Sequence, residues 1–352
     1  MDNNGGYSIV KKARFKNFTI TPNDTWKFCD GINIIIGENG LGKTHILKSI
    51  YSLIKVQSDK HGDLTKSSLE KSYADKIVAV MRSETLGRLV KRKQGRARCE
   101  MALSFSDEDF NCSINFSTNA KSSVEGQVFP KKTLSLSPVY IPTRELITLA
   151  PWFVALYDNY HLEFEETWRD TVSLLGAPTV KGPRERTVSA LLEPLEEAIG
   201  GKVVIDPKTA RFYLQIPGEG RMEMPLVAEG LRKIAMIARL ISSGVLLKHG
   251  YLFWDEPESN LNPKLIKVVA SILWTLAQHG IQIFCATHSL FMLRELEIIS
   301  QKEKKKKNKL RYFGLTQTNN GIILSQDDNL EGIGDFSSLD ESLKQSDRYL
   351  EI

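Results

Sequence analysis

Residues 32–44 read Ile32-Asn33-Ile34-Ile35-Ile36-Gly37-Glu38-Asn39-Gly40-Leu41-Gly42-Lys43-Thr44. The apolar first part predicts a buried strand, and the apolar spacing of residues 45–54 predicts a helix directly after the loop. A glycine-rich turn that ends in Lys-Thr, set between a strand and a helix, is typical of a loop that binds phosphates. Its glycines let backbone N–H groups curl around a phosphate, and the N-terminus of the following helix adds its dipole.

The motif assigns separate tasks to the residues of this loop. Lys43 is expected to reach the β- and γ-phosphates of ATP, and the Thr44 hydroxyl is expected to bind Mg²⁺. The residues expected to bind the nucleotide are Gly37, Asn39, Gly40, Gly42, Lys43 and Thr44. The alternative is a glycine-rich turn that contains Lys-Thr by chance, and the predicted strand and helix on either side disfavour it.

Two carboxylates follow a second apolar strand. Residues 251–254 read Tyr-Leu-Phe-Trp and lead directly into Asp255-Glu256-Pro257. At the carboxyl end of a buried strand, Asp255 is expected to lie beside the phosphate loop and to hold Mg²⁺. Glu256 is expected to polarise the attacking water as general base. A surface turn with two acids is the alternative, and the four apolar residues before them argue against it.

Two further segments make the sequence resemble the ABC-type ATPases. Ser259-Asn260-Leu261-Asn262 follows Asp-Glu-Pro-Glu as the dimer-facing D-loop follows the Walker B strand in that family. Ala286-Thr287-His288-Ser289 resembles the family's switch segment. The resemblance implies that His288 contacts the γ-phosphate and acts in catalysis. An isolated histidine is more often structural, but here the surrounding motifs favour the functional interpretation.

The sequence departs from the ABC-type pattern in two places. Where the family carries a Leu-Ser-Gly-Gly-Gln signature, residues 227–233 read Val-Ala-Glu-Gly-Leu-Arg-Lys, and only Gly230 matches. Gly230 is still expected to face a nucleotide, and Arg232 or Lys233 could supply charge in place of the missing serine. Residues 139–142 resemble the strand that leads to the Q-loop, but Thr-Arg-Glu follows with no glutamine.

These departures resemble the OLD-type and related stand-alone bacterial ATPases, which are common in phage-defence operons, more than they resemble transporter subunits. This resemblance implies that Mg-ATP is bound between two copies of the chain and hydrolysed there. We therefore expect a regulatory or sensor ATPase that controls a separate effector protein, such as a nuclease or toxin. The alternatives are a DNA-stimulated repair or recombination ATPase of the RecF-like branch, and a nucleotide-binding scaffold with negligible turnover.

We expect an α/β fold of the ABC-ATPase-like P-loop type, with N-terminal antiparallel strands and a helical insert. Strands are predicted at 7–15, 18–21, 98–105 and 111–116, three short helices within 145–199, and hairpins at 202–216 and 310–324. The predicted organisation is a discontinuous ATPase core over 1–54 and 203–326, a β/helical insertion over 55–138, a Q-loop-like segment with a helical subdomain over 139–202, and an acidic C-terminal tail over 327–352.

Composition excludes several classes of protein. Glycine and proline are too few for a collagen-like chain. No apolar run approaches the roughly 18 residues of a membrane span, and the first residues lack the layout of a signal peptide. We therefore expect a cytoplasmic protein with no membrane contact. Two basic clusters, Lys302–Arg311 and Lys91–Arg98, could contact nucleic-acid phosphates, although charge runs are more often solvated loops.

Overall fold

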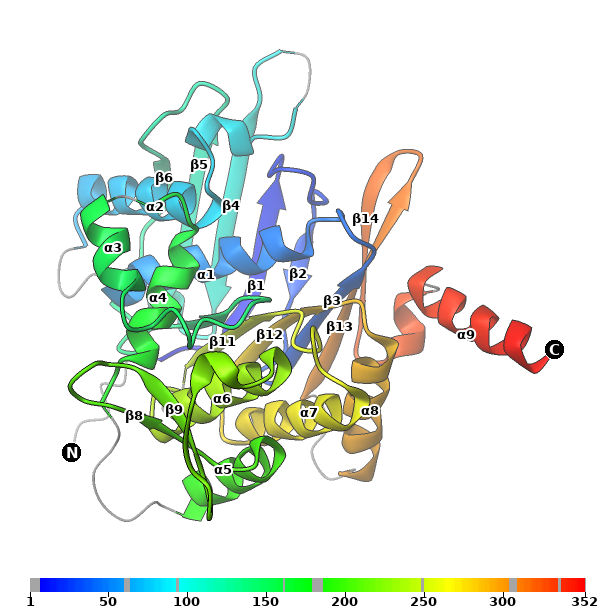
Figure 1. Cartoon of the computed structure of the whole chain (residues 1–352). Coiled ribbons are helices and arrows are strands. Elements are labelled where there is room, and N and C mark those ends of the chain that lie inside the picture. Colours follow the sequence, from blue (N-terminus) through cyan, green and yellow to red (C-terminus); the bar gives the residue numbers. More distant parts are fainter. Residues whose placement is uncertain are drawn as a thin grey trace.

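The computed structural model describes residues 7–59, 64–92, 95–160, 162–178, 186–247, 250–303, 309–334 and 337–351. Within these residues the centre of the molecule is a six-stranded sheet with the order β14-β13-β3-β12-β11-β7 (Figure 1). Its strands are β3 (Ile32–Gly37), β7 (Val139–Ile141), β11 (Tyr251–Asp255), β12 (Gln282–Thr287), β13 (Leu310–Thr318) and β14 (Gly321–Asp327). All neighbours pair in parallel except β13 and β14, which form the predicted terminal hairpin.

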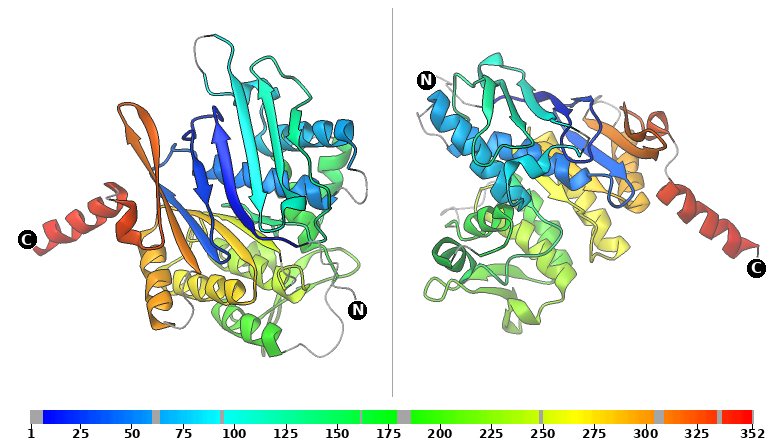
Figure 2. Two further views of the ribbon diagram at one scale, coloured as in Figure 1. Left: turned by 180° about the vertical axis from the view of Figure 1, so that it is seen from behind. Right: turned by 90° about the horizontal axis from the view of Figure 1, so that it is seen from above.

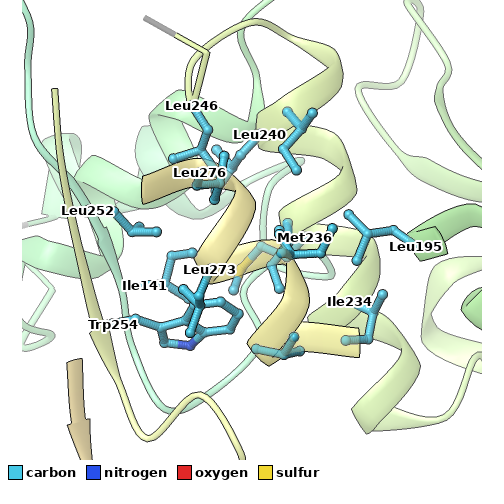
Figure 3. Packing of buried hydrophobic residues seen from close by; sticks show 14 of the residues in the cluster. Ile141, Leu195, Ile234, Met236, Leu240, Leu246, Leu252, Trp254, Leu273 and Leu276 are labelled. Carbon is cyan, nitrogen blue, oxygen red and sulfur yellow. The ribbon is translucent and has the colours of Figure 1, made fainter. Parts of the chain in front are cut away.

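The central strands are buried on both faces, as parallel strands covered by helices are. Residues of alternating parity divide between two cores. On one face Leu252 and Trp254 of β11 pack against α6 (Glu229–Ser242) and α7 (Pro263–Gln278) (Figure 3). On the other face Phe253 lies in a second core with α1 (Lys43–Asp59), the helix that follows the phosphate loop.

A second, antiparallel sheet covers the α1 side with the order β2-β1-β4-β5-β6. Its strands are β1 (Val10–Lys16), β2 (Thr25–Lys27), β4 (Arg98–Phe105), β5 (Cys112–Ser117) and β6 (Glu125–Val128), accompanied by α2 (Lys66–Met81), η1 (Leu86–Leu89) and η2 (Glu108–Phe110). The N-terminal antiparallel strands are thus confirmed. The strand predicted at 18–21 is wrong, because Asn17 and Thr19 have positive φ angles that break the pleat and Phe18 makes a single bridge to Val90.

The region between β7 and α6 contains three short helices, as predicted, and a small sheet. They are α3 (Phe153–Tyr160), α4 (Glu166–Leu175) and α5 (Arg186–Ile199), followed by η3 (Met224–Leu226) after the antiparallel strands β8 (Lys202–Ile205), β9 (Phe212–Ile216) and β10 (Gly220–Glu223). The hairpin predicted at 202–216 is β8–β9, and β10 is an additional strand. Residues 179–185, between α4 and α5, lie outside the described residues.

The C-terminal segment contains helices. After β14 come η4 (Leu330–Ile333) and α9 (Ser337–Leu350). Figure 2 shows α9 extending away from the body of the molecule, beyond the β13–β14 hairpin. The acidic composition of residues 327–352 predicts a tail and gives no sign of these helices. Among the helices of the described residues, none is long and apolar enough to cross a membrane.

Candidate active site

The carboxyl ends of β3, β11, β12 and β7 meet at one edge of the central sheet, and the predicted site residues follow these strands. This edge is where open α/β sheets bind ligands. The loop after β3 leads into α1, the segment Asp255–Asn262 leads from β11 into α7, and Thr287–Ser289 leads from β12 into α8 (Leu290–Lys302). The topology therefore brings together motifs that lie more than 200 residues apart in the sequence.

The phosphate loop has the backbone that its glycines permit. Gly40 and Gly42 have φ angles of 84° and 87°, in the left-handed region that side chains with a Cβ disfavour. The buried Lys43 ammonium donates hydrogen bonds to the carbonyl oxygens of Gly37 (2.7 Å) and Glu38 (2.9 Å), so it lies across the loop. Burial lowers the pKa of Lys43, against the opposing effect of Glu256 and its neighbouring carboxylates.

Thr44 and Asp255 form a ready pair of oxygen ligands. The Thr44 hydroxyl donates a hydrogen bond of 2.8 Å to Asp255 Oδ2, which joins the start of α1 to the end of β11. Asp255 is 7% exposed, and burial raises its pKa to about 6, although the Thr44 hydrogen bond opposes this. Mg²⁺ in nucleotide sites takes one or two protein oxygens in addition to phosphates and water. A hydroxyl and a carboxylate at this spacing fit that ion.

Glu256 lines two cavities. One cavity, of about 220 Å³, is lined by Ile20, Glu256 and the loop residues Asn39, Gly40 and Gly42–His45. The other, of about 650 Å³, is lined by Glu256, Glu258, Ser259, His288–Phe291 and Arg294. The carboxylate of Glu256 lies 3.4 Å from His288 Nδ1. Glu256 and His288 are therefore adjacent, and both line the larger cavity.

Glu258 is a functional candidate that sequence reasoning missed. It is 7% exposed, and its Oε1 accepts hydrogen bonds from the Thr287 hydroxyl (2.6 Å) and the His288 backbone N–H (3.3 Å). The other carboxylate oxygen is buried without a partner among the described residues. The signal in the sequence was a third acid in the four-residue stretch 255–258. Only the fold places this acid against the end of β12.

The signature-like segment is folded against its own chain. Arg232 forms an ion pair of 2.9 Å with Glu145, in the segment after β7 that resembles a Q-loop but contains no glutamine. Lys233 is 1% exposed and its ammonium faces the interior. Both cations were expected as substitutes for the signature serine. Lys233 is too buried to reach a nucleotide held by a second copy, and Arg232 is already paired with Glu145. Gly230 packs against the Asn260 backbone, where a Cβ would lie 2.4 Å from the carbonyl oxygen.

The basic clusters are partly neutralised. Arg98 makes a bidentate pair with Glu125 at 2.6 and 3.0 Å, and Arg311 pairs with Asp328 at 2.6 Å. Lys309 pairs with Asp30 at 2.8 Å. The four consecutive lysines at 304–307, which belong to the Lys302–Arg311 cluster, lie outside the described residues. The described cations of these clusters that pair with carboxylates are less available for phosphate contacts.

Comparison with known proteins supports the same architecture. A family model described as "AAA domain, putative AbiEii toxin, Type IV TA system" matches residues 133–294. The head of Smc bound to the C-winged helix domain of ScpA has a TM-score of 0.57 at 13% identity, covering 92% of this chain and 98% of that one. A Smc head with an extended coiled coil, bound to the C-terminal domain of ScpA derived from Pyrococcus furiosus, has a TM-score of 0.55 at 10% identity, covering 97% and 100%. The chain has the fold of an ABC-type P-loop ATPase.

Curated relatives match shorter segments of this ATPase fold. The glutamine transport ATP-binding protein GlnQ of Bacillus subtilis (strain 168) is 30% identical over 92 residues, 25% of this chain and 36% of that protein. The DNA replication and repair protein RecF of Francisella tularensis subsp. novicida (strain U112) is 39% identical over 57 residues, 16% of each chain. The matched segments thus span little more than a third of these relatives at most.

Proposed function

We propose that the chain binds Mg-ATP at the loop before α1 and hydrolyses it at an interface between two copies, as a regulatory ATPase that controls a separate effector protein. The observation that carries the proposal is the Thr44–Asp255 hydrogen bond of 2.8 Å. It places the phosphate loop beside a carboxylate at the end of β11, with Glu256 and His288 adjacent at 3.4 Å. These are the parts that metal-assisted phosphoryl transfer to water requires.

Each residue has one task in this proposal. Gly37, Asn39, Gly40 and Gly42 present the backbone to the phosphates, and Lys43 exchanges its carbonyl partners for phosphate oxygens. Thr44 and Asp255 would hold Mg²⁺, which when bound neutralises charge on the phosphates. Glu256 accepts a proton from the attacking water, and His288 donates a hydrogen bond toward the γ-phosphate. Gly230 and the start of α6 would close the site of a second copy.

We further propose that this regulatory ATPase acts in anti-phage defence. This role rests on the resemblance to stand-alone defence ATPases and on the family model named for a putative AbiEii toxin, which covers less than half of the chain. The effector is expected to be another protein, such as a nuclease or toxin. The RecF match of 39% over 57 residues favours the second candidate, a DNA-stimulated repair or recombination ATPase.

The first experiment measures ATP hydrolysis with and without duplex DNA while light scattering records molecular mass. Wild type is expected to hydrolyse ATP and to associate when ATP binds. Glu256→Gln is expected to keep ATP and to accumulate the associated form, because the base is lost while the phosphate contacts remain. Lys43→Ala is expected to lose nucleotide affinity and serves as the non-binding control.

The outcomes separate the candidates. Nucleotide-driven association without DNA stimulation supports the effector-controlling ATPase. Stimulation by DNA that fades as salt rises supports the repair-type ATPase instead. A Glu256→Gln protein that hydrolyses ATP as fast as wild type would show that the base is another residue. ATP binding with no turnover in wild type would support the remaining alternative, a nucleotide-binding scaffold with negligible turnover.

A further inference from the structure

A single buried lysine joins the start of α6 to the turn after β11. The Lys233 ammonium donates hydrogen bonds to the Glu256 carbonyl oxygen (2.7 Å) and to the Ser259 hydroxyl, and lies 3.4 Å from the Ser259 carbonyl oxygen. We call residues 256–259 the catalytic turn, because Glu256 is its first residue. Lys233 therefore spans from the signature-like helix to the catalytic turn of the same chain.

This position is energetically costly for a lysine. Among the described residues no carboxylate lies within ion-pair distance of the ammonium, whose other near neighbour is the Trp254 ring at 6.0 Å. Burial lowers the pKa of Lys233 to about 8, although Glu258, Glu256 and Asp255 oppose this from longer range. A buried charge without a close ion pair is unfavourable, and an unbranched apolar side chain would fill the same space without that cost. Fold stability alone therefore does not account for Lys233.

The catalytic turn has a backbone that requires support. Glu256 has a φ angle of 48°, in the left-handed region that is unfavourable for residues with a Cβ. Its N–H donates to the Ala286 carbonyl oxygen (2.9 Å), and its own carbonyl accepts hydrogen bonds from Ser259 and Lys233. The bond from the charged ammonium is the strongest type among these. Lys233 thus helps to hold Glu256 in an unfavourable conformation.

The start of α6 also contacts Asn260, the residue directly after the catalytic turn. The Asn260 side-chain amide donates to Glu229 at 3.0 Å, and Gly230 lies against the Asn260 carbonyl with no room for a Cβ. The Ser259 hydroxyl also lies 3.1 Å from the Thr143 carbonyl oxygen, beyond β7. A displacement of the first turn of α6 would therefore be transmitted to the backbone of Glu256.

We propose that Lys233 is a positioning residue that holds the carboxylate of Glu256 in register with the first turn of α6. A nucleotide bound by a second copy against Gly230 would then act on Glu256 of the chain that carries this glycine. The two sites of a dimer would be linked through one side chain in each copy. The link between two copies and the kinetic readout rest on the proposed function, whereas the role of Lys233 in holding the Glu256 backbone does not.

The test compares Lys233→Met with Lys267→Met, a matched control at an exposed lysine of α7. Mg-ATP affinity and turnover are measured on the full chain for both. Lys233→Met is expected to bind Mg-ATP within about twofold of wild type and to lose turnover by about 100-fold, the effect of a displaced catalytic group. Lys267→Met is expected to match wild type. A purely structural lysine would lower the melting temperature and leave turnover per folded molecule unchanged.

A crystal structure of each protein gives a readout that does not depend on hydrolysis. Lys233→Met is expected to change the φ angle of Glu256 and to separate its carboxylate from His288. If this variant fails to fold, Ser259→Ala removes the hydroxyl that the ammonium contacts and is expected to lower turnover in the same direction. Wild-type turnover in the folded variants, or an unchanged Glu256 backbone, would overturn the proposal. Absence of hydrolysis in wild type would refute the proposed function, while the crystal structures would still decide the role of Lys233.

Discussion

Under the proposed function, a proton and Mg²⁺ would compete for Asp255 at the end of a buried strand. Because burial raises its pKa to about 6, the folded protein favours the protonated form more than the unfolded chain does. This carboxyl group therefore favours folding at low pH, and its contribution is lost as pH rises through about 6. A metal ligand must be deprotonated, so Mg²⁺ binding has the opposite pH dependence.

We expect the Mg²⁺ affinity of the ATP-bound protein to fall by up to about tenfold per pH unit below pH 6. The measurement is the Mg²⁺ concentration that gives half-maximal hydrolysis at about pH 5.0, 6.0 and 7.5. These values lie below, at and above the raised pKa of about 6. Asp255→Asn cannot take up this proton and is expected to bind Mg²⁺ weakly at all three values. A wild-type Mg²⁺ requirement that does not change with pH would contradict this assignment.

Glu258 supports the backbone at Thr287 and His288. Its removal in Glu258→Ala leaves the Thr287 hydroxyl and the His288 N–H without their acceptor, a loss of about 1–3 kcal/mol of stability. We expect turnover to fall more than nucleotide affinity, because His288 moves while the phosphate loop does not. Glu258→Gln keeps one acceptor oxygen and is expected to recover part of the lost stability and part of the lost turnover. Melting curves and steady-state kinetics measure the two effects, with Glu219→Ala in the exposed β9–β10 turn as control.

The site residues differ in how far sequence could predict them. The loop that ends in Lys43-Thr44 is a contiguous motif, so its residues are recognisable before the fold is known. Glu258 and Lys233 are not, because their importance comes from contacts with β12 and with the turn after β11. A lysine on an amphipathic helix is usually solvated, and only its burial and its hydrogen bonds to the turn after β11 identify this one as internal.

At the scale of single elements, the start of α6 lies unusually close to the turn before α7. A Cβ at Gly230 would lie 2.4 Å from the Asn260 carbonyl oxygen, so any larger residue must displace one of the two segments. Gly230→Ala is expected to lower stability by about 1–3 kcal/mol, more than the helix propensity of alanine returns. Turnover is expected to fall with it.

Differential scanning calorimetry checks this effect against Gly176→Ala. Gly176 has a φ angle of −72°, and a Cβ there would meet nothing closer than 3.5 Å. The control is therefore expected to be tolerated. Equal melting temperatures for the two variants would mean that α6 and the turn can separate freely.

The parallel strands and the helices between them were predictable because each has a strong period and a clear boundary. The failures occurred where local backbone geometry or tertiary contacts override the pattern. Residues 18–21 are apolar enough for a strand, but the positive φ angles at 17 and 19 turn the chain away. The strand β10 is too short and polar to be recognised, and it forms because β9 offers an edge.

At the scale of the whole molecule, a buried polar cluster connects the helix of the phosphate loop to two other helices. Asp170 of α4 accepts hydrogen bonds from Tyr51 of α1 (2.6 Å) and from Lys76 of α2 (2.8 Å). Burial opposes the charge on Lys76, but Asp170 and Glu166 raise its pKa above the ordinary value. A bridge of 2.5 Å between Lys48 and Glu165 adds a second link from α1 to the start of α4.

Breaking this cluster on one side is expected to be more harmful than removing the buried ion pair entirely. Asp170→Leu leaves a buried ammonium with a single carboxylate partner and should lower the free energy of unfolding by about 3 kcal/mol. The double variant Asp170→Leu with Lys76→Met should recover most of that loss. Urea denaturation of both singles and the double measures the coupling, and Glu341→Ala in the exposed pair with Arg348 should change stability by less than about 1 kcal/mol. Additive single effects would contradict a cooperative cluster.

The left-handed backbone at Glu256 means that a substitution which raises thermal stability there would also remove the candidate base. Asparagine adopts this conformation more readily than glutamate, so Glu256→Asn would relieve a strain of about 1 kcal/mol while removing the candidate base. A laboratory selection for variants that survive heating would therefore favour substitutions at this position and enrich proteins that bind ATP without consuming it. An engineer who wants a durable ATPase must stabilise the molecule elsewhere and exclude position 256 from the library.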